Sequence, residues 1–395
     1  LLAGELFPDE VFTNSGLTGR QMQAKAKNML YEWFVTFRKE GFTEWNSSPY
    51  LPIDTLGFGS LYAFAQDPAM RELGREGMDF AYYLLAVHSQ KGIFASSSGR
   101  TYIKEQFGNW SNCPSGLSWI GYGYGVPGHA GKGITSYCLS DYEPPKEFAQ
   151  WFSIPRGKEM ICQTTQGNDG YVDLYTYKTA DYMMTSANDF HPGEPGHQEN
   201  PFQLTFNAVA QLWVTHPGER VLFGAARPSY WAGNGTLPKV NQYKAFAGLI
   251  YDIAPEHPVD FTHLYLPSME FDRCEVEGKW AFVQLGSAYA AVYCSNGMRM
   301  QDFGSNKDRE CIAEGRRCIW LVRAAQADEF AAFEDFKGAM RGAALDADAE
   351  GRRYRFVDPV YGELRCQWGE TLYVNDAPMQ YSGFDNYGKL TMQEK

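Results

Sequence analysis

Four polar residues in the first 102 positions are of the types needed to remove a proton beside a carboxylate. Asn46, His88, Arg100 and Tyr102 all fall where helical segments are expected to end. The C5 proton of a uronic acid can be removed once the charge developing on its carboxylate is stabilised, which Asn and Arg can do. A His or a Tyr must take that proton, and one must return a proton to the leaving oxygen. We therefore assign carboxylate binding to Asn46 and Arg100, and proton exchange to His88 and Tyr102.

Each of these residues also has an ordinary structural interpretation. His88 could be a helix-end histidine, Asn46 a helix cap, and Arg100 one half of a salt bridge. Their placement on consecutive loops between helices is what favours a shared site.

The loop around Asn46 carries further candidates for substrate contact. Glu44, Trp45 and Tyr50 lie within a few residues of it. Glu44 and Asp54 also form a carboxylate pair, and two carboxyl groups on either side of one glycosidic bond would make a hydrolase. Spacing along the chain does not give their separation, so both chemistries stay open.

A second group of candidates lies in residues 189–200, which contain two His and two Glu, with His216 shortly after. Such side chains could hold a divalent metal, although Pro and Gly make the stretch a bent loop without fixed spacing. A solvated loop is the ordinary alternative. We expect a substrate contact from His197 or His216 more than a metal site, and no cofactor is required.

A third candidate is the aromatic pair Tyr230 and Trp231, beside the sequence Gly233-Asn234-Gly235. Glycines allow a tight turn with positive φ, and the two rings next to it could form a platform for a sugar. A place in the core is an equal alternative.

The elements that position these residues change from helical to extended along the chain. Residues 17–39, 55–65 and 68–87 have helical periodicity, and Asp67 followed by Pro68 is a typical helix start. Residues 108–145 are rich in Gly and Tyr and aperiodic, which predicts a long loop.

From about residue 158 the apolar period drops to two, which predicts many short strands. The segment 288–294 followed by Asn296-Gly297 predicts a hairpin, and a helix is expected near 329–340. We predict an α+β chain with helices over 1–150, an antiparallel β-sandwich over 151–325, and a C-terminal β extension with one helix over 326–395.

Composition limits the partners of this 395-residue chain. The net charge of −12, without runs of Lys or Arg, argues against nucleic acid, and no apolar stretch approaches the roughly 20 residues that span a bilayer. The scattered cysteines fit reduced thiols better than a disulfide framework. A cytoplasmic location is slightly favoured, and a homo-oligomer is left open.

Three segments resemble heparinase II/III-like and alginate-lyase-like proteins. They are residues 41–47, residues 92–102, and the stretch from 181 through Gly196-His197-Gln198. The resemblance implies an incomplete (α/α) toroid followed by a large antiparallel β-sandwich, and cleavage of acidic glycans by β-elimination. It also implies an Asn that binds the carboxylate and a His and a Tyr that exchange protons. Asn46, His88 and Tyr102 are the positions of this sequence that match these three roles.

Two departures from the family pattern bear on these expectations. A complete toroid needs roughly twice the helices found here, so this chain is expected to hold its C-terminal part. The His-Gly-His-x-Asp pattern frequent in the family is replaced by residues 196–200, Gly-His-Gln-Glu-Asn, which weakens the expectation of a metal.

The leading hypothesis is a polysaccharide or oligosaccharide lyase acting on an acidic glycan. A glycoside hydrolase and a non-catalytic glycan-binding protein are the alternatives.

Overall fold

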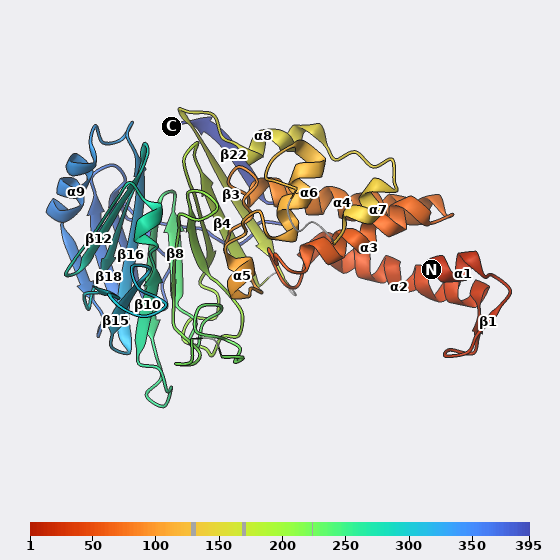
Figure 1. The fold of residues 1–395 in the computed structure, drawn as a ribbon, viewed down its shortest axis with the longest axis horizontal. Helices are drawn as coiled ribbons and strands as arrows, with labels where there is room; N and C mark the ends of the chain where they lie inside the picture. The colour runs from red at the N-terminus through yellow and green to blue at the C-terminus, as the bar shows by residue number, and fades with distance from the viewer. Residues whose placement is uncertain (128–131, 168–170, 223) are drawn as a thin grey trace.

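The fold is α+β, with helices in the N-terminal part and antiparallel sheets in the rest. The structure, a computed structural model, describes residues 1–127, 132–167, 171–222 and 224–395. Figure 1 shows the helices at one end of an elongated molecule and the sheets stacked at the other. Within the described residues, no helix is both long enough and apolar enough to cross a bilayer.

Two long helices follow the expected boundaries closely because their caps are encoded locally. Helix α2, Gly19–Glu40, begins after Thr18, whose side chain accepts from the Gln21 N–H while the Gln21 side chain bonds back to Thr18. Helix α4, Pro68–Val87, spans the predicted residues, and the Asp67 carboxylate accepts from the backbone N–H of Ala69 at 2.9 Å.

Two helical predictions need correction. Helix α3, Leu51–Phe64, begins four residues before the predicted start, with Pro52 in its first turn. The predicted loop 108–145 contains two helices, and α6 among them ends on Gly123 in the left-handed conformation. Its Gly-rich composition concealed the helical period, and residues 128–131 of that loop lie outside the described part. The other helices are α1 Leu2–Leu6, α5 Ile103–Gln106, α6 Cys113–Tyr122, α7 Ile134–Cys138, α8 Ala149–Phe152 and α9 Phe333–Gly342.

The larger sheet lies next to the helices (Figure 1). Within the described residues it has nine antiparallel strands in the order β14-β15-β10-β7-β6-β5-β4-β3-β22. The last strand along the chain pairs with β3, so the C-terminal residues return to the sheet beside the helices. The strands are β3 Lys158–Gln166, β4 Val172–Lys178, β5 Met183–Asn188, β6 Phe202–Thr205, β7 Gln211–Thr215, β10 Phe261–Tyr265, β14 Arg299–Met300, β15 Glu310–Glu314 and β22 Lys389–Glu394.

A second antiparallel sheet packs face to face with the first, with apolar side chains of both between them. Tyr251 donates its hydroxyl to the carbonyl of Val214 at 3.2 Å, and the indole of Trp320 donates to Thr262 at 2.8 Å, so hydrogen bonds also join the two sheets. In the order β11-β12-β13-β16-β9-β8 the strands are Arg273–Glu277, Trp280–Leu285, Ala288–Cys294, Arg317–Gln326, Phe246–Asp252 and Lys239–Tyr243.

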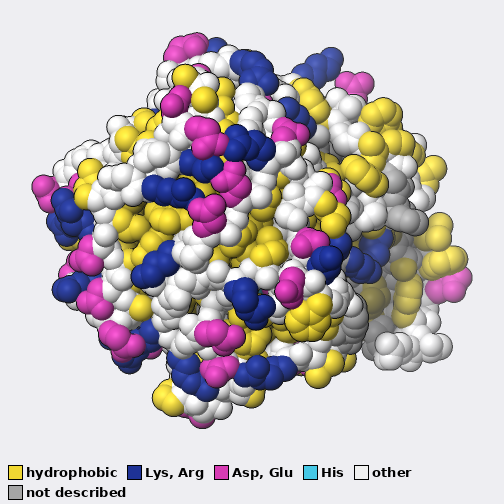
Figure 2. Space-filling view, turned by 60° about the vertical axis from the view of Figure 1, so that its left-hand side comes forward, with side chains coloured by type: hydrophobic (Ala, Val, Ile, Leu, Met, Phe, Trp, Pro, Cys, Tyr) yellow, Lys and Arg dark blue, Asp and Glu magenta, His cyan; other side chains and the backbone are white. Residues whose placement is uncertain are grey.

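The outer side of this second sheet is covered by α9 and a small sheet. Phe336 of α9 packs on Tyr289, and Phe356 stacks on Phe246 with ring centres 5.7 Å apart. Figure 2 shows acidic and basic side chains interspersed over this end of the molecule, where α9 forms ion pairs with β11. The small sheet consists of β17 Leu345–Asp348, β18 Arg353–Asp358, β19 Gly362–Gln367, β20 Tyr373–Val374 and β21 Ala377–Pro378, and a two-stranded pair, β1 Val11–Phe12 and β2 Leu17–Thr18, lies near the N-terminus.

The strand predictions are confirmed in the main, but the predicted hairpin at Asn296-Gly297 is wrong. Strand β13 has the predicted bounds, yet it pairs with β12 and β16, whereas the following strand β14 pairs with β15 in the other sheet. The turn therefore carries the chain from one sheet to the other. A turn motif encodes a local reversal of direction, not the partner of the next strand.

Candidate functional site

Many side chains on the face of the large sheet that meets the helices are polar, although Met160 and Cys162 of β3 pack in the apolar core of the helices. The polar side chains form hydrogen bonds with the backbone of residues 86–107. Lys178 donates to the carbonyls of Ala86 at 3.0 Å and Val87 at 3.3 Å, and also to that of Trp151. Further bonds join Thr205 to Ala95, Gln203 to Gln106, Gln211 to Phe107, and Ser97 to Thr185. The segment that carries Arg100 and Tyr102 is thus attached to the sheet along its length.

Three loops meet on this segment. Ser98 and Asn200 exchange backbone hydrogen bonds of 2.9 and 2.7 Å, and the Thr101 N–H donates to the carbonyl of Gln198. The Gly99 N–H donates to the carbonyl of Trp45 at 2.8 Å. Loop 44–50 from the helices and loop 197–200 from the sheet therefore flank residues 97–102, as the sequence prediction required.

Arg100 is at the centre of the charged groups in this region. Its Nη1 lies 2.9 Å from Oε1 of Glu44, and its Nη2 donates to the hydroxyl of Tyr102 at 3.4 Å. The guanidinium carbon lies 4.9 Å from the ring centre of Tyr50. Glu44, Tyr50, Arg100 and Tyr102, predicted separately as site residues, are therefore brought together.

Tyr102 also lies close to residues from loops of the β-sheet part. The guanidinium of Arg227 lies over its ring at 5.1 Å, with no hydrogen-bond or ion-pair partner among the described residues. The exposed His197 bonds through Nδ1 to the carbonyl of Arg227 at 3.1 Å, which places this histidine at the rim. Gln198 is buried beside Tyr102, and its Oε1 has no partner in the described part of the chain.

This environment favours the phenolate form of Tyr102. The hydrogen bond from Arg100 lowers the pKa of Tyr102 below its usual 10, burial opposes this, and Gln198 and the charges of Arg100 and Arg227 lower it further. A tyrosine of this kind can accept a proton at a lower pH than an isolated one.

A groove runs from this cluster along the helices. It has a volume of about 720 Å³, and Glu44, Tyr50 and Asp54 are among the residues that line it. Burial, and then the charge of Glu44, raise the pKa of Asp54 to about 7. Near neutral pH this carboxyl group can therefore either hold or release a proton.

The raised pKa of Asp54 predicts a pH-dependent loss of stability. As pH rises from about 4 to 7 the unfolded chain releases this proton first, so the folded state becomes progressively less stable. Asp54→Asn should therefore be more stable than wild type at pH 8, by on the order of 2 kcal/mol after allowing for solvent screening, and similar at pH 4. Urea unfolding at the two pH values measures this. An equal difference at both would contradict the assignment.

Two predicted site histidines lie in the interior instead of at the site. His88 ends α4 and is fully buried, its Nδ1 lies 2.9 Å from the Thr176 hydroxyl, and burial lowers its pKa to about 3. His216 is also fully buried, with Nε2 bonded to the carbonyl of Val259 and a pKa lowered by burial to about 3. The sequence showed the two residue types but not that the end of α4 and the end of β7 are covered by other parts of the fold.

The predicted aromatic contacts are also part of the core. Trp45 is buried against Phe190, and a Cβ at Gly99 would come within 2.7 Å of its indole nitrogen. Tyr230 and Trp231 are buried too, and Trp231 stacks on His263 with ring centres 4.1 Å apart. None of these three rings offers a face to a sugar.

Asn46 is buried and connects loop 44–50 to the segment 97–102. Its side-chain amide donates to the carbonyl of Ser97 at 3.3 Å, it is 2 % exposed, and its Oδ1 has no partner within the described residues. Its backbone is in the left-handed region, with φ of 49°. We interpret Asn46 as a positioning residue for the loop that carries Glu44.

The loop 189–200 does not gather its acidic and imidazole side chains. His191 lies 3.5 Å from Glu194, while His197 is turned to Arg227. Across the described residues, no three His, Cys, Asp or Glu side chains are arranged to hold a metal ion. The predicted site residues that do come together, Glu44, Tyr50, Arg100 and Tyr102, form an arginine–tyrosine cluster beside a groove.

Comparison with known proteins identified no relative of this chain. No protein-family model, no curated protein and no solved structure matches the chain.

Proposed function

We propose that this protein is a polysaccharide or oligosaccharide lyase that cleaves next to a uronic acid by β-elimination. In this proposal its helices are part of an (α/α) toroid, and the loops at their ends bind an acidic glycan. The observation that carries the proposal is that two guanidinium groups contact Tyr102: Arg100 donates to its hydroxyl at 3.4 Å, and Arg227 lies 5.1 Å from its ring centre.

The reaction needs a cationic site for the uronate carboxylate. Arg227 has no anionic partner among the described residues, and Arg100 shares its charge with Glu44. Two guanidinium groups on one carboxylate stabilise the negative charge that develops when the C5 proton leaves.

Tyr102 then serves as both base and acid, because His88 is enclosed in the interior. Its phenolate takes the C5 proton, and the electron pair of the C5–H bond forms the C4–C5 double bond. The C4–O4 bond breaks, and the leaving oxygen receives the proton from the Tyr102 phenol. The phenolate is restored, and no further reagent is consumed.

The direct test is digestion of a panel of acidic glycans while ultraviolet absorbance is followed in the unsaturated-uronate band. A lyase produces that absorbance in step with new reducing ends. New reducing ends without the absorbance would contradict the proposal.

Arg227→Met is expected to shift the pH dependence of the reaction. A base must be deprotonated, so kcat/KM should rise with pH towards the lowered pKa of Tyr102. Removing the nearby positive charge raises that pKa, which moves the rise to higher pH, and it also weakens carboxylate binding. We expect kcat/KM to fall by about 10²-fold at neutral pH. A fall that is uniform at every pH would contradict the electrostatic coupling of Arg227 to Tyr102.

A glycoside hydrolase is the second candidate, and one specific observation favours it. Asp54 and Glu44 line the same groove, and Asp54 has a pKa of about 7, which suits a general acid. Against this, Glu44 is paired with Arg100. Asp54→Asn would abolish a hydrolase but leave most of the activity of a lyase that uses Tyr102.

A further inference from the structure

The groove that begins at the arginine–tyrosine cluster extends well beyond it. A second hollow of about 760 Å³ continues it between α2 and α3, and the two share Met29, Trp33 and Asp54. The surface beside Arg100 is therefore continuous with a long cleft, which is the shape needed to hold a sugar next to the one that reacts.

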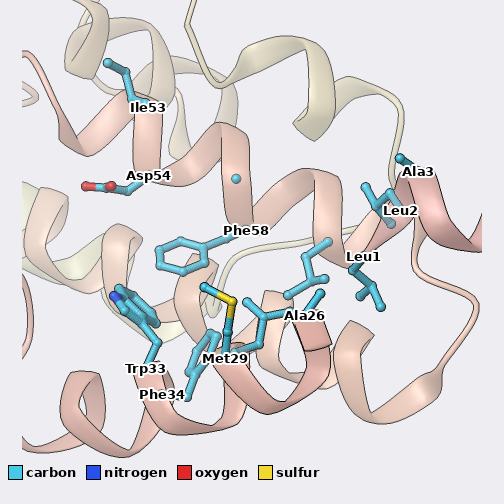
Figure 3. A pocket seen from close by; sticks show the side chains of 13 residues that line it. Leu1, Leu2, Ala3, Ala26, Met29, Trp33, Phe34, Ile53, Asp54 and Phe58 are labelled. Atoms are coloured by element: carbon cyan, nitrogen blue, oxygen red, sulfur yellow. The ribbon is translucent and has the colours of Figure 1, made fainter. Parts of the chain in front are cut away.

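Trp33 provides a flat surface in the middle of this cleft. Figure 3 shows its ring beside the space that Asp54 and Phe58 also border. The indole stacks on Phe37 with ring centres 4.7 Å apart, yet it remains 43 % exposed. A ring held in this way can pack against the C–H face of a pyranose at little entropic cost.

The charged side chains of this part of the cleft are acidic. Glu32, Glu44 and Asp54 line the hollow nearest the cluster, and no Lys, Arg or His side chain is among the described residues that line it. Carboxyl groups accept hydrogen bonds from sugar hydroxyls, and Glu32, which has no cationic partner among the described residues, repels a second uronate. Arg100 and Arg227 line neither hollow, and Arg100 adjoins the cleft through its ion pair with Glu44.

We infer that the cleft binds an uncharged sugar adjoining the uronate, so that the substrate is a heteropolymer of uronic acid and neutral sugars and not a polyuronate. Trp33 stacks on the neutral residue, and the carboxylates bind its hydroxyls. This inference rests on the proposed lyase function for the uronate end of the site.

The first experiment compares wild type with Trp33→Ala on two kinds of polymer. Gellan and xanthan join uronate to neutral sugars, whereas polygalacturonate and alginate are polyuronates. We expect wild type to cleave at least one heteropolymer at least tenfold faster than either polyuronate, and Trp33→Ala to lose about tenfold in kcat/KM on it. Trp119→Ala is the matched control, because Trp119 on α6 is similarly exposed, at 45 %, and does not line the cleft. Faster cleavage of the polyuronates, or equal rates for Trp33→Ala and Trp119→Ala, would overturn the inference.

A second experiment separates this inference from the lyase proposal. Calorimetric titration of the Tyr102→Phe variant with a hexasaccharide repeat of the heteropolymer measures binding without turnover. We expect Trp33→Ala to weaken binding about tenfold and Trp119→Ala to leave it unchanged. That result supports the cleft even if no polymer yields an unsaturated product and the lyase proposal fails. Binding that is insensitive to Trp33→Ala overturns the cleft assignment, even if lyase activity is found. Glu32→Lys should in addition raise affinity for hexagalacturonate, since it removes a repulsive charge and adds an attractive one.

Discussion

Tyr102→Phe is expected to lower the turnover of an acidic glycan by about 10²–10⁴-fold, the usual contribution of one group that moves a proton in the transition state. The variant loses only the hydroxyl that receives a hydrogen bond from Arg100. The ring and its contact with Arg227 remain, so substrate binding should change by less than a few-fold. The measurement is kcat and KM from the initial rate of unsaturated-uronate absorbance.

Tyr31→Phe is the control for this experiment, because Tyr31 is an exposed tyrosine on α2 and does not line the cleft. It should match wild type in both constants. If Tyr102→Phe retains more than a tenth of wild-type kcat, Tyr102 does not transfer the proton.

Lys178→Met is expected to destabilise the fold by about 1–3 kcal/mol, the usual cost of leaving buried hydrogen-bond acceptors without a donor. The Lys178 amino group is fully buried and bonds three backbone carbonyls, two at the end of α4 and one at Trp151, and burial lowers its pKa to about 7. Methionine has nearly the same length but no donor, so these carbonyls would stay buried without their hydrogen bonds. Urea or thermal unfolding followed by circular dichroism measures the loss.

Lys158→Met provides the comparison on the same sheet. Lys158 is only partly buried on β3 and pairs with Glu394 at 3.5 Å, so its loss should cost less than about 1 kcal/mol. Equal losses for the two variants would show that Lys178 does not hold the helices to the sheet.

The helices were predictable where the signals are local. Asp67 and Pro68 define the start of α4 by a side-chain cap and a ring that favours helical φ. The ten residues of α6 were missed because Gly and Ser occupy positions that a periodicity search expects to be apolar.

The strands were predictable from alternation, but their partners were not. The period of two separates the inner and outer faces of a strand such as β13. It does not tell what covers each face. One face can be buried against another sheet, and the other, such as the face that carries Lys178, against backbone carbonyls that need hydrogen bonds. Pairing depends on contacts far apart in the sequence, which a single chain does not reveal.

The site was predicted in part, because residue types show which chemistry is available but not which residues reach one another. Arg100 and Tyr102 are two residues apart on an extended segment, so their proximity followed from the sequence. Arg227 was missed as a site residue because it comes from a loop more than a hundred residues later, without a recognisable motif. His88 was misassigned because a histidine at a helix end looks the same in the sequence whether it faces solvent or, as here, Thr176.

The measurement that bears most directly on the central claim is a crystal structure of Tyr102→Phe soaked with a uronate-containing oligosaccharide. We expect the uronate carboxylate to be bound by Arg100 and Arg227, with its C5 next to the para carbon of the ring at position 102, where Tyr102 carries its hydroxyl. A glycan bound instead with its glycosidic bond between Glu44 and Asp54, and its carboxylate away from both arginines, would contradict the claim and favour hydrolysis.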